Sequence, residues 1–115
     1  MDERLEKAFQ TANYMTTLSN QRKVILEEFQ QSLIYYFQGA SFTVERNLIT
    51  FISTLVARDI TVAVVLDDKN IPVEIPDLKL FLDEIMAIYA SATNEYLIKY
   101  NQIRSKRRIG DLMAL

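Results

Sequence analysis

The sequence predicts an α+β fold with two long antiparallel helices that form a coiled-coil-like hairpin. A short helix and a small antiparallel sheet of about three strands are expected to cap this hairpin at one end. Three observations predict it. Apolar residues recur at three-four spacing near both ends of the chain, as in long amphipathic helices. Between those segments, two β-branched runs flank a polar turn. Only two Gly and two Pro occur in 115 residues, so little of the chain is irregular.

Length and composition limit the classes of function. With 115 residues, half of them hydrophobic, the chain is expected to form a single domain over 1–115. The formal net charge is only −2, so any nucleic-acid binding must be local. The absence of Cys and His excludes disulfides, zinc sites and thiol or imidazole catalysis within one chain. We therefore predict a protein that is not an enzyme and has no catalytic residues, cofactor or metal.

The first helix is expected over residues 2–38. Its apolar stripe consists of Leu5, Ala8, Ala12, Met15, Leu26, Phe29, Leu33 and Tyr36. Leu18 and Ile25 form an adjacent stripe, which indicates a shift of the packing face in the middle of the helix. Gly39 is expected to end the helix, because glycine readily takes the left-handed conformation that closes helix C-termini.

The central segment, 40–75, is expected to contain the cap. A strand is predicted at 40–44 and a helix at 45–58. Apolar residues cover most of the circumference of this helix, so it must be buried on nearly every side, either inside the monomer or against another copy. The β-branched runs 61–66 and 71–75 predict a β-hairpin. Its first strand is expected to be central, with the strand at 40–44 on its other side.

The closing helix is expected over residues 77–107, with Pro76 and Asp77 at its start. Its stripe consists of Leu78, Leu82, Ile85, Tyr89, Ala92, Tyr96 and Ile103, widened by Phe81, Ile88 and Tyr100. Several large apolar residues lie off this stripe, namely Leu80, Met86, Leu97 and Ile98, as Phe9 does on the first helix. A helical hairpin cannot bury all of them, so we predict a homo-oligomer that forms through the long helices.

A basic cluster near the end of the closing helix is the candidate site for an anionic partner. It consists of Lys99, Arg104, Lys106, Arg107 and Arg108. These cations could pair with the phosphates of a nucleic acid. Alternatively, antiparallel packing brings them beside the acidic residues Asp2, Glu3 and Glu6 within the hairpin. The sequence leaves both interpretations open.

The last residues, 109–115, form a short apolar tail after a break expected at Gly110. Ile109, Leu112, Met113 and Leu115 are candidate residues for docking to a protein. Exposed apolar residues at a chain end favour association, so the tail is expected to pack either on its own chain or on a partner. Both remain open.

The N-terminal segment lacks the basic and then apolar pattern of a signal peptide, and no run approaches the ~18 apolar residues of a membrane span. We expect no membrane partner and a cytoplasmic location.

Three stretches carry a resemblance: 34–44 (IYYFQGASFTV), 64–78 (VVLDDKNIPVEIPDL) and 89–115 (YASATNEYLIKYNQIRSKRRIGDLMAL). They resemble a small family of uncharacterised proteins encoded by T4-like tailed phages of marine bacteria. The resemblance implies a phage protein that acts in the host cytoplasm or in the virion, with a phage or host protein as partner. It assigns no catalytic or binding residue.

The expected function is therefore that of a non-enzymatic, homo-oligomeric interaction protein, serving as an assembly, structural or host-directed regulatory module. The alternative is a nucleic-acid-binding accessory protein that uses the basic end of the last helix.

Overall fold

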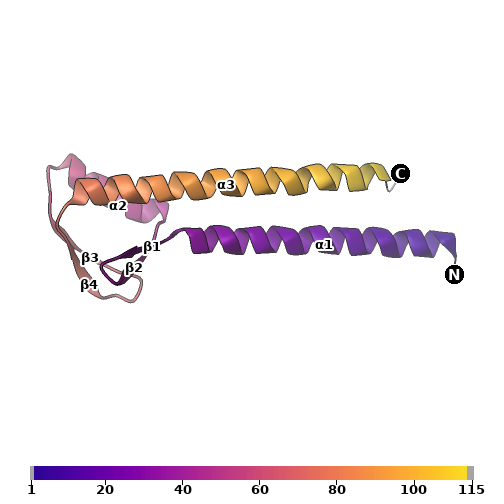
Figure 1. The fold of residues 1–115 in the computed structure, drawn as a ribbon, viewed down its shortest axis with the longest axis horizontal. Coiled ribbons are helices and arrows are strands. Elements are labelled where there is room, and N and C mark those ends of the chain that lie inside the picture. Colours follow the sequence, from indigo (N-terminus) through magenta and orange to yellow (C-terminus); the bar gives the residue numbers. More distant parts are fainter. Residues whose placement is uncertain (1, 114–115) are drawn as a thin grey trace. The chain divides into compact units, whose positions relative to one another are not determined.

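The structure is a computed structural model that describes the backbone of residues 2–113 and the side chains of residues 2–106. The described residues form three helices and four strands (Figure 1), which makes the fold a mostly helical member of the α+β class. In chain order they are α1 (Glu3–Ser32), β1 (Ile34–Phe37), β2 (Ala40–Thr43), α2 (Arg46–Ala57), β3 (Ala63–Leu66), β4 (Pro72–Ile75) and α3 (Leu78–Met113).

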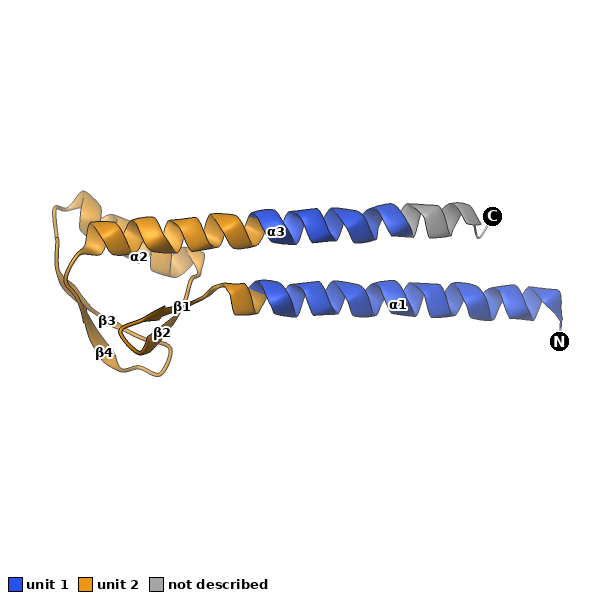
Figure 2. Ribbon diagram, viewed as in Figure 1, with its two compact units in different colours: residues 1–29, 94–115 blue, residues 30–93 orange. Residues whose placement is uncertain are grey.

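The chain divides into two compact units (Figure 2). Unit 1 comprises residues 1–29 and 94–115, and unit 2 comprises residues 30–93. Unit 1 is made of most of α1 and the second half of α3. Unit 2 contains the four strands, α2 and the first half of α3.

The hairpin of β1 and β2 replaces the predicted end of the first helix. Helix α1 ends at Ser32, so the prediction that it continues to Gln38 was wrong. Gln38 and Gly39 both have positive φ, 49° and 82°, which suits a two-residue turn between antiparallel strands. Gly39 therefore closes a hairpin rather than a helix. The aromatic run before it favours strand over helix, because such residues pack well on a pleated surface.

The second predicted hairpin is confirmed, with β3 and β4 paired so that Val65 lies opposite Val73. Asp67 begins the turn. Its buried carboxylate accepts hydrogen bonds from the backbone N–H groups of Lys69 and Ile71 at 2.9 and 2.8 Å. The side chain thus takes the place of backbone acceptors within the turn, as Asp does in Asx turns.

The prediction of one sheet with about three strands was wrong, because the two hairpins form separate two-stranded sheets. Asp68 explains the separation. Its backbone N–H donates to the Ser41 carbonyl at 2.9 Å, and its carboxylate accepts from the backbone N–H and the hydroxyl of Thr43, both at 2.9 Å. These contacts occupy the edge of β2 that β3 was expected to pair with.

Helix α2 ends where Asp59 adopts a positive φ of 59°. The Asp59 N–H donates to the Val56 carbonyl and the Ile60 N–H to the Leu55 carbonyl, which is the hydrogen-bond pattern of a Schellman motif. Of this helix only Ile52 is fully buried, while Phe51 is half exposed. Within the chain, α2 is therefore not buried on nearly every side, because one of its faces is exposed; burial of that face against another copy stays a prediction.

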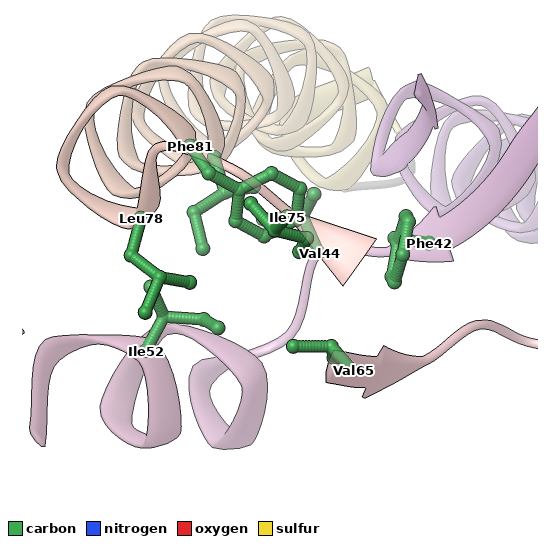
Figure 3. Close-up of a cluster of buried hydrophobic side chains, with 8 residues drawn as sticks. Phe42, Val44, Ile52, Val65, Ile75, Leu78 and Phe81 are labelled. Atoms are coloured by element: carbon green, nitrogen blue, oxygen red, sulfur yellow. The ribbon is translucent and has the colours of Figure 1, made fainter. Parts of the chain in front are cut away.

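Unit 2 has one hydrophobic core (Figure 3). Phe81 of α3 lies at its centre, with the rings of Tyr35, Phe37 and Phe42 at centroid distances of 5.7, 5.6 and 5.4 Å. The buried residues of this core are Phe42, Val44, Ile52, Val65, Ile75, Leu78, Phe81 and Ile85. Strands from both hairpins and two helices contribute to it, so unit 2 is held together by contacts distant in sequence.

In unit 1, α1 and α3 run antiparallel, since Tyr14, Arg22 and Glu28 contact Lys106, Tyr100 and Lys99 respectively. We call their contact the seam. It consists of Tyr14, Leu18, Gln21, Ile25 and Phe29 on α1 with Tyr96, Tyr100 and Ile103 on α3. The stripe predicted for α3 is confirmed, because its residues there are buried or half-buried.

For α1, the predicted shift of the packing face to Leu18 and Ile25 is confirmed, but most of the other residues of the expected stripe do not pack. The adjacent stripe with Leu18 and Ile25 is buried, whereas Leu5, Met15 and Leu26 of the expected stripe are exposed. Two apolar stripes compete on this helix, and the one bearing Leu18 and Ile25 is the one that packs.

Helix α3 continues beyond its expected end at Arg107 and reaches Met113. Gly110 was expected to interrupt it, but the backbone stays helical there. A single glycine within a helix costs only about 1 kcal/mol, which does not stop a helix of this length.

Candidate functional site

The main candidate site is the apolar face of α1 that the seam leaves uncovered. We call it the outer stripe and define it by Leu5, Ala8, Ala12, Met15 and Leu26, all of which are exposed. Their spacing places them on one side of the helix, about a third of a turn away from the residues of the seam. Between Met15 and Leu26 the same side of the helix carries Ser19 and Arg22, which interrupt the stripe. The apolar parts of the stripe have the character of a helix-packing surface.

Helix α3 also exposes large apolar side chains in unit 1. Leu97 and Ile98 are 56 % and 60 % exposed. The prediction that they lie off the packing stripe is confirmed, as it is for Leu80 and Met86 in unit 2. Both helices of unit 1 thus combine one buried stripe with further apolar surface.

Aromatic and cationic side chains line one side of the seam. The Arg22 guanidinium lies 5.5 Å from the centroid of the Tyr100 ring and donates a long hydrogen bond of 3.4 Å to its hydroxyl. The rings of Tyr96 and Phe29 lie 4.9 Å apart, and Tyr96 stacks on Tyr100 at 6.2 Å. The tyrosines therefore belong to the helix contact.

Among the predicted basic residues, Lys99 is already paired. Its Nζ lies 2.7 Å from Glu28 and 3.1 Å from Glu95. These hydrogen bonds to carboxylates raise the pKa of Lys99 above its ordinary value. Lys99 is therefore paired within the helix pair, and its partner on α1 is Glu28.

Lys106 and Arg104 line two different hollows in unit 1. Lys106 and Lys99 line a groove of about 380 Å³ in unit 1, together with Thr17, Asn20, Gln21, Val24, Ile25, Gln102 and Ile103. Arg104 instead lines a small depression with Arg22 and Tyr100. Arg107 and Arg108 lie outside the residues whose side chains the structure describes. The five predicted cations therefore do not form one described patch.

Gln21 is an unsatisfied group in the seam. Its Oε1 atom is buried and has no hydrogen-bond partner among the described residues. Tyr14, Leu18, Gln21 and Ile25 have the spacing of a packed helical stripe, which could have predicted that Gln21 is buried. The expected stripes were defined by apolar residues, so they did not include this polar one.

The predicted docking residues of the tail, Ile109, Leu112, Met113 and Leu115, also lie outside the described side chains. Their backbone is helical as far as Met113. Their role as a docking segment stays a prediction.

In unit 2, the most perturbed polar group is Tyr35. Its hydroxyl donates a hydrogen bond to the Glu84 carboxylate. Burial, followed by this hydrogen bond and the negative charge of Glu84, raises the pKa of Tyr35 to about 12. A tyrosine with such a pKa stays protonated at neutral pH, so it is suited to holding the strand against α3 rather than to proton transfer.

No cluster of three or more carboxylates suited to a metal ion occurs in the described part of the chain. Within the same residues, no helix is long and apolar enough to cross a membrane. No protein-family model, curated protein or solved structure matches the chain. The surfaces of the described residues are therefore the basis for inferring function.

Proposed function

We propose that the chain is a non-enzymatic interaction protein that self-associates through the outer stripe of unit 1. The observation that carries the proposal is the pair of stripes on α1, one packed on α3 and the other apolar and exposed. A helix that offers two apolar stripes is suited to packing against two neighbours, as helices in bundles do. A second copy of the helix pair would supply the second neighbour.

In this proposal, α1 and α3 of two copies pack as a four-helix arrangement. Ala8 and Ala12 are small, which favours close approach of two helix backbones, while Leu5, Met15 and Leu26 supply apolar area on either side. The residues left over, including Leu97 and Ile98, would border this contact or meet a protein partner. In the phage setting implied by the resemblance, such a module would serve assembly, virion structure or regulation of the host.

The experiment replaces Met15 and Leu26 together by glutamate. Two charges placed at the packed stripe cannot be paired there, so self-association should weaken at least about 100-fold. Sedimentation velocity over a concentration series measures this. The matched control is Asn13→Glu, which adds a charge to the exposed polar side of the same helix. A chain that is monomeric before any substitution, or a double variant that associates as the parent does, would contradict the proposal.

The nucleic-acid alternative has weaker support. Arg104 and Lys106 are exposed and available, and Lys106 lies beside the amides of Asn20 and Gln102 in the groove. Lys99, however, is held by two carboxylates. An anionic partner would therefore depend on Arg104 and Lys106 together with the residues after them.

A further inference from the structure

The two lysines of the groove in unit 1, Lys99 and Lys106, have different surroundings. They lie on the same side of α3, about two turns apart. Lys99 is paired with Glu28 of α1, at 2.7 Å, and with Glu95 of its own helix, at 3.1 Å. Among the described side chains, no carboxylate lies within 4.0 Å of the Lys106 ammonium group. One lysine of the groove is therefore neutralised, and the other has no counter-charge.

The helix repeat explains this difference. Since α1 and α3 run antiparallel, a heptad step of about two turns forward on α3 matches a heptad step back on α1. Applied to the contacts of Lys99, this step leads from Lys99 to Lys106, from Glu95 to Gln102 and from Glu28 to Gln21. Both amides line the groove together with Lys106. Around Lys106, glutamine thus stands at each position that glutamate holds around Lys99.

The two glutamines have the shape of glutamate but no charge. An amide offers N–H donors, whereas a carboxylate only accepts hydrogen bonds. The Gln21 amide buries its Oε1 atom in the seam without a partner among the described residues, so its NH2 group points away from the seam. In place of two carboxylates, Lys106 is therefore accompanied by N–H donors. This combination suits an anion that accepts hydrogen bonds.

The groove also has an apolar wall, which consists of Val24 and Ile25 of α1 and Ile103 of α3. Its volume of about 380 Å³ lies within the range of roughly 300 to 1,000 Å³ that is usual for small-molecule sites. A lone inorganic ion would leave most of this volume and the apolar wall unused. The ligand that fits therefore combines one acidic group with an apolar body.

We propose that the groove binds a small organic carboxylate. Its acidic group is held by Lys106, Gln21 and Gln102, and its apolar body lies on the apolar wall. The choice of a carboxylate follows from Lys99, because at the equivalent position the protein itself pairs a lysine with two carboxylates. The ligand supplies the negative charge that the glutamines do not.

The groove and the outer stripe are different surfaces of α1. Thr17 and Val24 line the groove, whereas Met15 and Leu26 belong to the outer stripe. Thr17 is two residues from Met15, and Val24 is two residues from Leu26, which places each pair on nearly opposite sides of a helix. Carboxylate binding in the groove therefore goes beyond the proposed self-association.

The first test uses octanoate as the probe, with isothermal calorimetry for affinity and the NMR methyl signals of Val24 and Ile103 for location. Octanoate should bind at one site per chain and shift these signals. Octanamide has the same body without the charge, and acetate has the charge without the body, so each should bind at least about 10-fold more weakly. Absence of octanoate binding at these residues, or equal binding of octanoate and octanamide, overturns the proposal.

The second test removes the unpaired charge. Lys106→Gln should weaken octanoate binding at least about 10-fold, because the carboxylate loses its charge-assisted hydrogen bond. The matched control is Lys23→Gln, which removes the same charge from an exposed position outside the groove and should leave the affinity unchanged. Equal losses in the two variants would mean that binding follows net charge, and would overturn the site.

A third test fills the site from within the chain. Gln102→Glu gives Lys106 the carboxylate that Glu95 gives Lys99, so octanoate binding should again weaken at least about 10-fold. Asn101→Glu adds the same charge at an exposed position outside the groove and is the control. A Gln102→Glu protein that binds octanoate as the parent does overturns the assignment of the acidic group to Lys106. Circular dichroism establishes that each variant is folded.

The outcomes separate this site from the self-association when both are measured on the parent chain at the same concentration. A monomeric chain that binds octanoate contradicts the outer stripe and supports the groove. An associating chain that does not bind octanoate overturns the groove and leaves the outer stripe standing.

Discussion

Unit 2 and unit 1 differ in how much of their apolar surface they bury by themselves. The core cluster of unit 2 contains eight buried apolar residues, contributed by both hairpins, Val44 after β2, α2 and α3. Among the side chains that the structure describes, unit 1 buries three, Leu18, Ile25 and Ile103, along a single line of contact between two helices. Because burial of apolar area is the main force in folding, unit 2 has the means to stand alone, whereas unit 1 has much less.

The difference indicates which part of the molecule needs a neighbour. Two helices that touch along one seam leave most of their circumference in water, and three buried residues give little stability against the entropy of ordering long helices. The exposed outer stripe is then a consequence of an incomplete core. In the proposed self-association, a second copy completes the core of unit 1, whereas unit 2 has its own core.

The largest expected effect lies in the core of unit 2. Phe81→Ala removes the ring around which Tyr35, Phe37 and Phe42 pack, and should lower the free energy of unfolding of this unit by about 3 to 5 kcal/mol. Ile103→Ala in the seam should cost about 2 kcal/mol or less, because the seam borders on water and can relax. Chemical denaturation measures both.

Leu80, which precedes Phe81 in α3, provides the control for the comparison of Phe81→Ala with Ile103→Ala. Leu80 is 55 % exposed, so Leu80→Ala should change the stability by no more than about 0.5 kcal/mol. Equal losses for Phe81→Ala and Ile103→Ala would show that the two units do not differ in the way described.

A smaller effect of opposite sign is expected in the seam. Gln21→Leu replaces the buried and unpartnered Oε1 acceptor by an apolar group of similar size, and should stabilise unit 1 by about 1 kcal/mol. Thermal unfolding followed at the α1 helix measures it, with the exposed Gln10→Leu as the control. A loss of stability in Gln21→Leu would mean that the amide has a partner in solution.

The sequence correctly predicted those elements whose pattern of apolar residues fits only one kind of secondary structure. The stripe of α3 from Leu78 to Ile103 was predicted because a single three-four pattern runs through it, and the hairpin of β3 and β4 because β-branched runs flank a polar turn. The end of α1 was missed because Gly39 fits both a helix terminus and a hairpin turn, and only the pairing of β1 with β2 decides between them.

The candidate site was predictable only in part, for a related reason. Helix α1 has two apolar stripes, and periodicity alone does not tell which one meets α3 and which one stays exposed. For the basic residues, the sequence showed the charges but not their partners. Lys99 pairs with Glu28, which is 71 positions away, so this contact depends on the register of the two helices.

Hydrogen exchange at two protein concentrations tests directly whether unit 1 depends on a second copy and unit 2 does not. We expect amide protection in residues 3–29 and 94–106 to rise when the concentration increases from about 1 to about 100 μM, because association stabilises by mass action. Protection of the core elements of unit 2, α2 and residues 78–92, should stay the same. Equal protection of both units at both concentrations would contradict this expectation.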